Sequence, residues 1–247
     1  MYEKVIVTNN IIEVYTYEKL NIKDKKLSSK NLEVHQDKLT DLENYKRSQK
    51  RRRETIRRLV CTNFKNDSSK FLTLTFKDDI RDVKKANKEF KKFIQRLNYF
   101  IQKKDLNFKL KYVAVVEFQD KNRDGVVHYH IICNLPYIPK KFIEDTWGRG
   151  FIKINRIDKV DNLGAYVTKY MNKDIDDDRL MGLKAYNCSK NLDRPVEFKN
   201  WKSDESNIID NLKEMYHLDK IKPVYENSYT GLEIGQVTYK QYNLSRV

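Results

Sequence analysis

Residues 112–135 constrain the fold of this chain more than any other stretch, because they have the pattern of two strands joined by a turn. The first strand, YVAVVEF at 112–118, is apolar except for Glu117 near its end. The second, VVHYHIICNL at 126–135, carries two of the chain's four histidines within an apolar run. Asn and Gly in the NRDG segment between them favour a tight turn. The stretch therefore predicts a β-hairpin.

The two histidines of this hairpin point to the same side. His128 and His130 are two residues apart, and residues two apart in a strand share a face. If NRDG is a four-residue turn, Lys121 pairs with Val126, and Glu117 then lies directly opposite His130. Two imidazoles and a carboxylate form a mixed nitrogen and oxygen site suited to Mn²⁺ or Mg²⁺, with zinc as an alternative. The ordinary alternative is a pair of half-buried polar histidines.

The charge balance indicates a polyanionic partner, and nucleic acid is the first candidate. Lys and Arg number 50 against 35 Asp and Glu, which gives a net charge of +15. KRSQKRRRETIRR at 46–58 predicts an exposed basic helix. A second helix, capped by Asp79 or Asp82, has one apolar face and one lysine-rich face. We expect both to contact phosphates through Arg51, Arg52, Arg53, Lys84, Lys88 and Lys91. A solvated charged face is the alternative for each.

A third group of residues lies in YVTKYMNK at 166–173. On a helix, Tyr166, Lys169, Tyr170 and Lys173 fall at i, i+3, i+4 and i+7 and form one stripe. Nearby ammonium groups favour the phenolate form of a tyrosine, and a lysine can also balance the charge of a phosphate. We expect Lys173 to contact DNA. The alternative is an amphipathic helix with tyrosines at the edge of the core.

The remaining pattern predicts an α+β fold. We expect strands within 2–20, at 71–76 and at 150–157, and helices at 140–147, from Asp161 and within 201–218. Residues 21–40 are polar and unpatterned, and the tyrosine-rich end has no pattern that predicts an element. The expected division is an N-terminal hairpin and linker (1–45), a main domain (46–200) and a C-terminal extension (201–247).

Cysteine usage and hydropathy predict a cytoplasmic location without membrane contact. Cys61, Cys133 and Cys188 are far apart, odd in number and free of zinc-ligand spacing, which indicates buried thiols in a reducing compartment. The sequence contains no apolar run long enough for a membrane span and no signal-peptide core near its N-terminus.

Three of these motifs together resemble the HUH endonucleases, and above all the rolling-circle replication initiators of bacteriophages and plasmids of the gene A or gene II type. The motifs are FLTLTF as a first strand, VHYHII as the metal-binding strand and GAYVTKYMNKD as the nucleophile helix, in that order. The resemblance covers roughly residues 46–200. It implies a five-stranded antiparallel sheet in a ferredoxin- or RRM-like arrangement with flanking helices.

The resemblance also implies a mechanism and assigns residues to it. A divalent metal held by His128, His130 and Glu117 would polarise a phosphate of single-stranded DNA. Tyr166 would attack, assisted by Lys169, to leave a 5′-phosphotyrosyl link and a free 3′-hydroxyl, and Tyr170 matches the second tyrosine of members that use two. The expected partner is single-stranded or supercoiled origin DNA. Because the sequence has no ATPase motif, a host or separately encoded helicase is implied.

Three other functions fit part of the sequence. A conjugative relaxase or single-strand transposase would use the same chemistry, but relaxases carry a three-histidine cluster, and such transposases are usually shorter. A non-catalytic RRM-like module would bind nucleic acid by stacking on sheet aromatics, without a metal. A basic structural protein would explain the charge but neither the histidine pair nor the tyrosine stripe.

Overall fold

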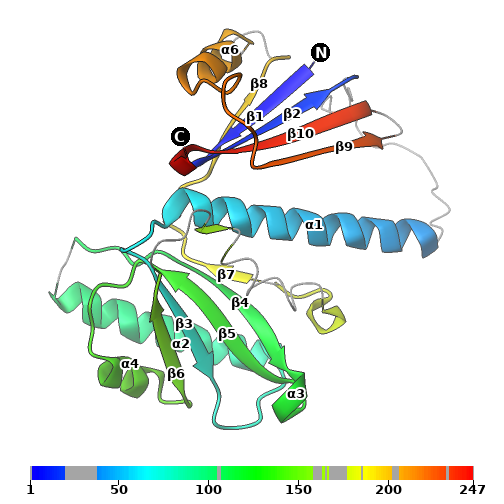
Figure 1. Cartoon of the computed structure of the whole chain (residues 1–247). Helices are drawn as coiled ribbons and strands as arrows, with labels where there is room; N and C mark the ends of the chain where they lie inside the picture. Colours follow the sequence, from blue (N-terminus) through cyan, green and yellow to red (C-terminus); the bar gives the residue numbers. More distant parts are fainter. Residues whose placement is uncertain are drawn as a thin grey trace, which may run out of the picture. The chain divides into compact units, whose positions relative to one another are not determined.

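The computed structural model describes residues 2–19, 38–104, 107–157, 163–164, 166, 177–184, 186–201, 206–231 and 234–246. The chain forms two compact units. One comprises residues 1–45 and 195–247, and the other comprises residues 46–194 (Figure 1). The sequence pattern predicts the two ends of the chain as separate segments, but they form one unit.

The second unit holds most of the elements that the sequence pattern predicts. Its helices are α1 (Lys38–Asn63, which begins in the first unit), α2 (Val83–Lys104), α3 (Asp120–Arg123), α4 (Lys140–Trp147) and the 3-10 turn η2 (Asp178–Leu180). Its strands are β3 (Lys70–Thr75), β4 (Tyr112–Gln119), β5 (Val126–Cys133), β6 (Ile152–Arg156) and β7 (Tyr186–Cys188).

These five strands form one antiparallel sheet in the order β6-β3-β5-β4-β7. The predicted α+β class and five-stranded antiparallel sheet are confirmed. Helix α2 begins where expected, because the Asp82 carboxylate accepts hydrogen bonds from the backbone N–H groups of Lys84 and Lys85 at 2.7 and 3.3 Å. This N-cap satisfies donors that have no partner within the helix.

One face of the sheet packs on α2 and α4. Tyr129 of β5 is buried and stacks on Phe90 of α2, with ring centroids 4.6 Å apart. Trp147 of α4 is also buried, contacts Phe93 of α2, and donates a hydrogen bond from Nε1 to the Thr75 carbonyl at 3.1 Å. Because Tyr129 lies between His128 and His130 in the strand, this packing turns both histidines toward the opposite face.

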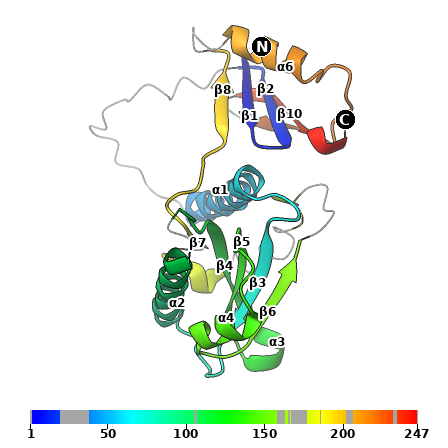
Figure 2. The same ribbon diagram turned by 90° about the vertical axis from the view of Figure 1, so that its left-hand side faces the viewer.

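Helix α1 contributes to the same core. Its residues Ile56, Leu59 and Val60 are buried in one hydrophobic cluster with the sheet and α2, as is Phe64 just after the helix ends. The predicted basic helix therefore has an apolar side as well, and it is held by burial rather than by charge alone. Figure 2 gives a second view of the helices around this sheet.

The first unit is a second antiparallel sheet in the order β8-β1-β2-β10-β9. Its elements are β1 (Tyr2–Val7), β2 (Ile11–Tyr17), β8 (Val196–Lys199), α6 (Ser206–Met215), β9 (Tyr225–Gly231), β10 (Gly235–Asn243) and the 3-10 turn η3 (Leu244–Arg246). The predicted N-terminal hairpin is present, and the tyrosine-rich end supplies two strands that the pattern does not predict. Ile209 of α6 and Leu218 pack with Val5, Ile12 and Val14 of the hairpin.

Within the described part of the chain, no helix combines the length and apolar character needed to cross a membrane. Cys61 and Cys133 are buried free thiols, and Cys188 is a half-buried one.

Candidate metal centre

The β4–β5 hairpin brings the predicted ligands together, but in a different register from the predicted one. Glu117 pairs with His128, and His130 pairs with Val115. The expected pairing of Glu117 with His130 is wrong because the connection contains six residues, including the short helix α3, instead of a four-residue turn. The shift is two residues, and side chains repeat every two residues along a strand, so Glu117 stays on the histidine face.

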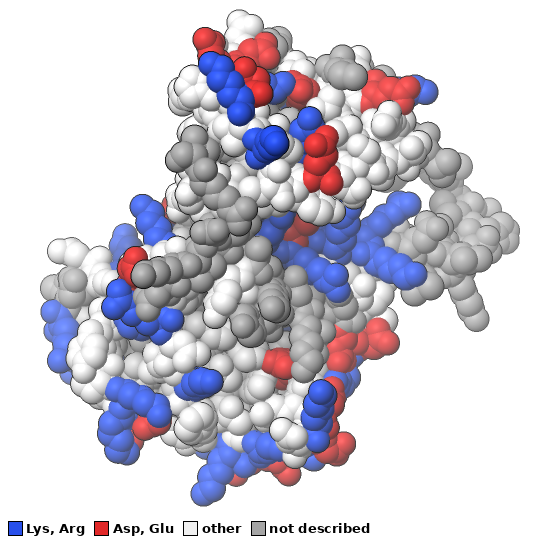
Figure 3. Space-filling view, viewed as in Figure 1, with Lys and Arg blue, Asp and Glu red and all other residues white. Residues whose placement is uncertain are grey.

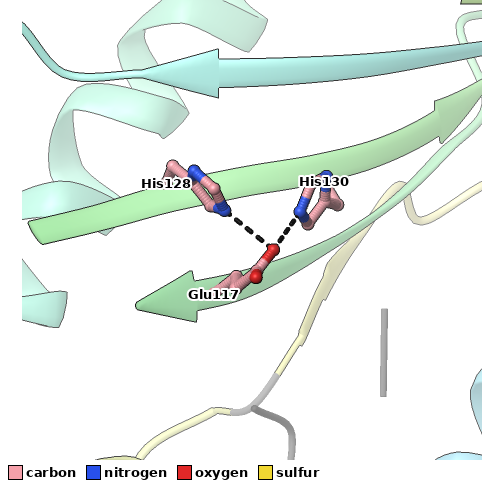
Figure 4. A group of neighbouring side chains, drawn as sticks. All are labelled: Glu117, His128 and His130. Carbon is pink, nitrogen blue, oxygen red and sulfur yellow. Dashed lines mark hydrogen bonds and ion pairs between the residues drawn. The ribbon is translucent and has the colours of Figure 1, made fainter. Parts of the chain in front are cut away.

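The three side chains converge on one carboxylate oxygen (Figure 4). His128 Nε2 lies 2.8 Å from Glu117 Oε2, and His130 Nε2 contacts the same oxygen. All three side chains are mostly buried, with exposed fractions of 12% to 15%. Each residue offers one ligand atom, and these atoms lie within 4.8 Å of one another.

The carboxyl group of Glu117 is ionised at neutral pH. Burial raises the pKa of Glu117, but the hydrogen bonds with His128 and His130 outweigh this effect and hold that pKa well below its usual range. An anionic carboxylate beside two imidazoles is the form in which all three groups can act as metal ligands.

Thr73 of β3 adds a contact that the sequence analysis missed. Its hydroxyl lies 3.2 Å from His130 Nδ1, and the two residues pair directly across β3 and β5. The hydroxyl can accept a hydrogen bond from Nδ1–H, and that tautomer makes the Nε2 lone pair available to a metal ion. His128 Nδ1 is buried and has no such partner among the described residues. The alternation of threonine with apolar residues in FLTLTF is the signal that could have identified Thr73.

The donor set fits a divalent cation. Two imidazole nitrogens and one carboxylate oxygen suit first-row divalent ions, and each ligand atom lies at about 2.0 to 2.2 Å from an ion such as zinc. Atoms within 4.8 Å of one another can reach that arrangement with shifts of under about 1 Å. Because both imidazoles contact one oxygen of Glu117, a bound cation would take the place of these contacts.

The face that carries the ligands continues across the sheet to β6. Lys153 pairs with Thr73, which pairs with His130, so the three residues form one row. A second row runs from Phe151 through Thr75 to His128. The Thr75 N–H donates a hydrogen bond to the Phe151 carbonyl at 2.9 Å, and Thr75 pairs with His128. Phe151 is 60% exposed, and Lys153 is also exposed. Lys153 thus lies in the row of His130, and the exposed Phe151 ring lies at the edge of the sheet, where Lys140 Nζ of α4 is 5.1 Å from its centroid.

Gly150 allows this arrangement at the edge of the sheet. Its φ of 149° lies in a region that favours glycine, and an added Cβ would lie only 2.3 Å from the Thr75 carbonyl oxygen. Glycine at this position lets the segment that leads into Phe151 lie close to β3, whereas a larger residue would push the two segments apart.

The predicted nucleophile helix is described only at its start. Leu163, Gly164 and Tyr166 are helical, and Tyr166 is 40% exposed. A Cβ on Gly164 would lie 2.4 Å from Cys61 Sγ, so this segment packs closely against α1. Lys169, Tyr170 and Lys173 lie outside the described residues, so the predicted stripe stays a prediction.

Arg179 attaches the segment that follows this helix to the end of the hairpin. Its guanidinium group donates to both carboxylate oxygens of Asp120, at 2.8 and 2.9 Å, and to the Asp177 carboxylate at 2.6 Å. It also lies over the Phe118 ring, 3.8 Å from the centroid. The hydrogen bond from Arg179 is the main cause that holds the pKa of Asp177 below its usual range. Arg179 therefore joins residues 177–180 to the turn that follows the Glu117 strand.

The predicted phosphate-binding residues lie on two helices. On α1, Arg51 and Arg53 are exposed and Arg52 is half-buried, and Figure 3 shows basic side chains on the face of that helix turned toward the viewer. On α2, Lys84, Lys88 and Lys91 are exposed. Because α2 packs on the Tyr129 face, its lysines lie on the other side of the sheet from the histidines.

Comparison with known proteins gives one match. Residues 69–175 match the family model of the replication-associated proteins of the ORF2 and gene II protein type, and this range contains all three motifs of the sequence analysis. No curated protein and no solved structure matches the chain.

Proposed function

Because residues 69–175 match this family of replication-associated proteins, we propose that the chain is a rolling-circle replication initiator that nicks and rejoins single-stranded origin DNA. The proposed reaction is a metal-dependent transesterification with a tyrosine nucleophile. It would produce a 5′-phosphotyrosyl intermediate and a 3′-hydroxyl that primes synthesis.

The observation that carries this proposal is the convergence of Glu117, His128 and His130 on one sheet face. These ligands lie on the sheet face opposite α2 and α4, and their side chains keep exposed fractions of 12% to 15%. An ionised glutamate and two imidazoles would hold Mn²⁺ or Mg²⁺, and the bound ion would supply Lewis-acid polarisation of the scissile phosphate.

The remaining chemistry belongs to residues of the chain. In the proposed step, the Tyr166 oxygen forms a bond to phosphorus while the bond from phosphorus to the 3′ oxygen breaks. The phenol loses its proton, and the released 3′ oxygen takes one up. Lys169 would favour the phenolate. Because one phosphoester replaces another, the intermediate keeps the energy needed for rejoining.

The sheet face offers a path for the single strand. Phe151 and Lys153 lie in the same two rows as His128 and His130. Exposed aromatics stack on bases, and lysines contact phosphates, in single-strand binding proteins. We propose that the strand crosses β3 from the ligand cluster to the β6 edge. A separate helicase would supply this strand from the origin duplex.

The test uses the full chain and single-stranded oligonucleotides that tile the replicon encoding it. With Mn²⁺, at least one oligonucleotide should give a covalent adduct on a denaturing gel. His130→Ala should abolish the adduct, while single-strand affinity changes little because other groups provide most phosphate contacts. Full cleavage in excess chelator would contradict the proposal.

The matched control is His217→Asn. It removes an imidazole from the first unit, and asparagine tolerates the positive φ of 48° found there. This variant should form the adduct at the rate of the original chain. If single-strand binding is strong but no oligonucleotide yields an adduct, the chain acts as a non-catalytic nucleic-acid-binding module instead.

A further inference from the structure

A groove of about 570 Å³ lies between α2 and the β7 edge of the five-stranded sheet. Its lining includes three lysines of α2, one asparagine each from α2 and β7, and one tyrosine of β4. These are Lys84, Lys88, Lys91, Asn87, Asn187 and Tyr112. The nucleic-acid reaction proposed above does not use this groove.

The groove and the ligand cluster lie on opposite faces of the sheet. Tyr112 and Glu117 are five residues apart in β4, which pairs with β5 without interruption, so their side chains point to opposite sides. The Tyr112 ring contacts Phe90 of α2, at a centroid distance of 5.8 Å, which places it on the helix face. The groove is therefore separated from the ligand cluster by the sheet itself.

The lysines of the groove differ from the other basic residues of α2. Lys92 pairs with Glu89 at 2.8 Å, and Arg149 pairs with the same carboxylate at 2.9 Å. Arg96 donates to the Thr146 carbonyl. By contrast, none of the three groove lysines has an acidic partner within the described parts of the chain. Their positive charge is thus uncompensated and faces one concave surface.

The polar groups of the groove are mainly hydrogen-bond donors. The Asn87 carbonyl oxygen already accepts from Asn187 Nδ2 at 2.7 Å and from the Tyr129 hydroxyl at 3.0 Å, which leaves its amide N–H groups available. Burial raises the pKa of Tyr112, so its hydroxyl keeps its proton at neutral pH. Ammonium, amide and hydroxyl donors together suit phosphate oxygens.

The spacing of the lysines indicates a nucleic-acid backbone. Lys84, Lys88 and Lys91 follow one side of α2 over about 10 Å. Along the axis of a duplex, successive phosphates of one strand advance by about 3.4 Å, so a helix parallel to that axis would span about three phosphates over this length. A single free phosphate would engage only part of the row.

We propose that this α2–β7 groove binds the phosphate backbone of duplex DNA that flanks the nicked strand. The proposal rests on the proposed function only for the identity of the DNA, because unmelted origin next to a nick is duplex. The chain would then hold the duplex on one face of the sheet and the cleaved strand on the other.

The test compares two triple variants of the full chain. The groove variant replaces Lys84, Lys88 and Lys91 by Gln. It should bind a duplex of about 20 base pairs at least about tenfold more weakly. The slope of log affinity against log salt concentration should also become shallower by about two to three units. The control replaces Lys92, Lys141 and Lys240 by Gln, which removes the same charge from lysines that have acidic partners. We expect the control to change duplex affinity less than about twofold.

Three outcomes would overturn the groove assignment. They are unchanged duplex affinity in the groove variant, equal losses in both triple variants, and a loss of oligonucleotide cleavage as large as the loss of duplex affinity. Thermal unfolding measurements check that each variant is folded. Tyr112→Phe is a second test, and we expect it to bind the duplex more weakly. Since duplex binding is measured without cleavage, this result stands whether or not the original chain forms an adduct.

Discussion

Thr73 and His130 face each other across β3 and β5, and the threonine hydroxyl lies 3.2 Å from His130 Nδ1. This contact can orient the imidazole and keep Nε2 directed toward Glu117. We expect Thr73→Val to weaken Mn²⁺ binding about 10- to 100-fold, because outer partners of histidine ligands have effects of this size. Isothermal titration of the metal measures the change. Thr73→Ser keeps the hydroxyl and should restore most of the affinity, whereas equal losses in both variants would contradict the role.

Tyr166 is the predicted first nucleophile, and Tyr170 the second. On a helix the two would be one turn apart, about 6 Å along the axis, so both could reach one phosphate in turn. Tyr166→Phe should eliminate or severely reduce the first adduct. Tyr170→Phe should still nick once but fail in strand transfer. Mass spectrometry of the DNA-linked peptide decides the assignment, and an adduct found only on Tyr170 would reverse it.

Arg51, Arg52 and Arg53 on α1 should contribute to phosphate binding. Replacing all three by Gln keeps helix-forming residues at these positions. The slope of log single-strand affinity against log salt concentration should become shallower by up to about two units. Replacing Lys199, Lys213 and Lys240 removes equal charge from lysines paired with glutamates. If both triple variants show the same slope as the original chain, the arginines are only a solvated face.

Phe151 should stack on a base of the single strand. Its ring is 60% exposed in the row that continues through Thr75 to His128. Phe151→Ala should reduce single-strand affinity by about 1 to 3 kcal/mol, the usual contribution of one stacked base. Tyr99 is 63% exposed on α2 and serves as the control, since Tyr99→Ala should have little effect. Fluorescence anisotropy with a labelled oligonucleotide measures both.

Arg179 should act as a positioning residue for the segment that precedes it. It joins residues 177–180 to Asp120 through two hydrogen bonds that a lysine cannot reproduce. Arg179→Lys should slow adduct formation about tenfold without changing Mn²⁺ affinity. Arg81→Lys alters a side chain that contacts Asp124 in the same turn but not residues 177–180, and it should leave the rate near that of the original chain. A matching loss of metal affinity would show that Arg179 instead supports the ligand cluster.

The sequence by itself determined the strands of the hairpin and the face of its ligands. Alternation of side chains in β4 and β5 depends only on local backbone geometry, so His128, His130 and Glu117 lie on one face in either register. The same local rule placed Tyr129 on the helix side, where it stacks on Phe90. Helix α2 was equally predictable, because its apolar spacing and the Asp82 cap lie within one short stretch.

Tertiary structure alone decided the register, the terminal sheet and the groove. The register depended on α3, a four-residue helix within what reads as a simple turn. Strands β8, β9 and β10 join β1 and β2 across most of the chain length, and such pairing depends on distant partners more than on local pattern. The groove required Asn187 of β7 to meet Asn87 of α2 at 2.7 Å, although 100 residues separate them. Contacts of this kind form only when separate elements pack, so no local pattern in the sequence records them.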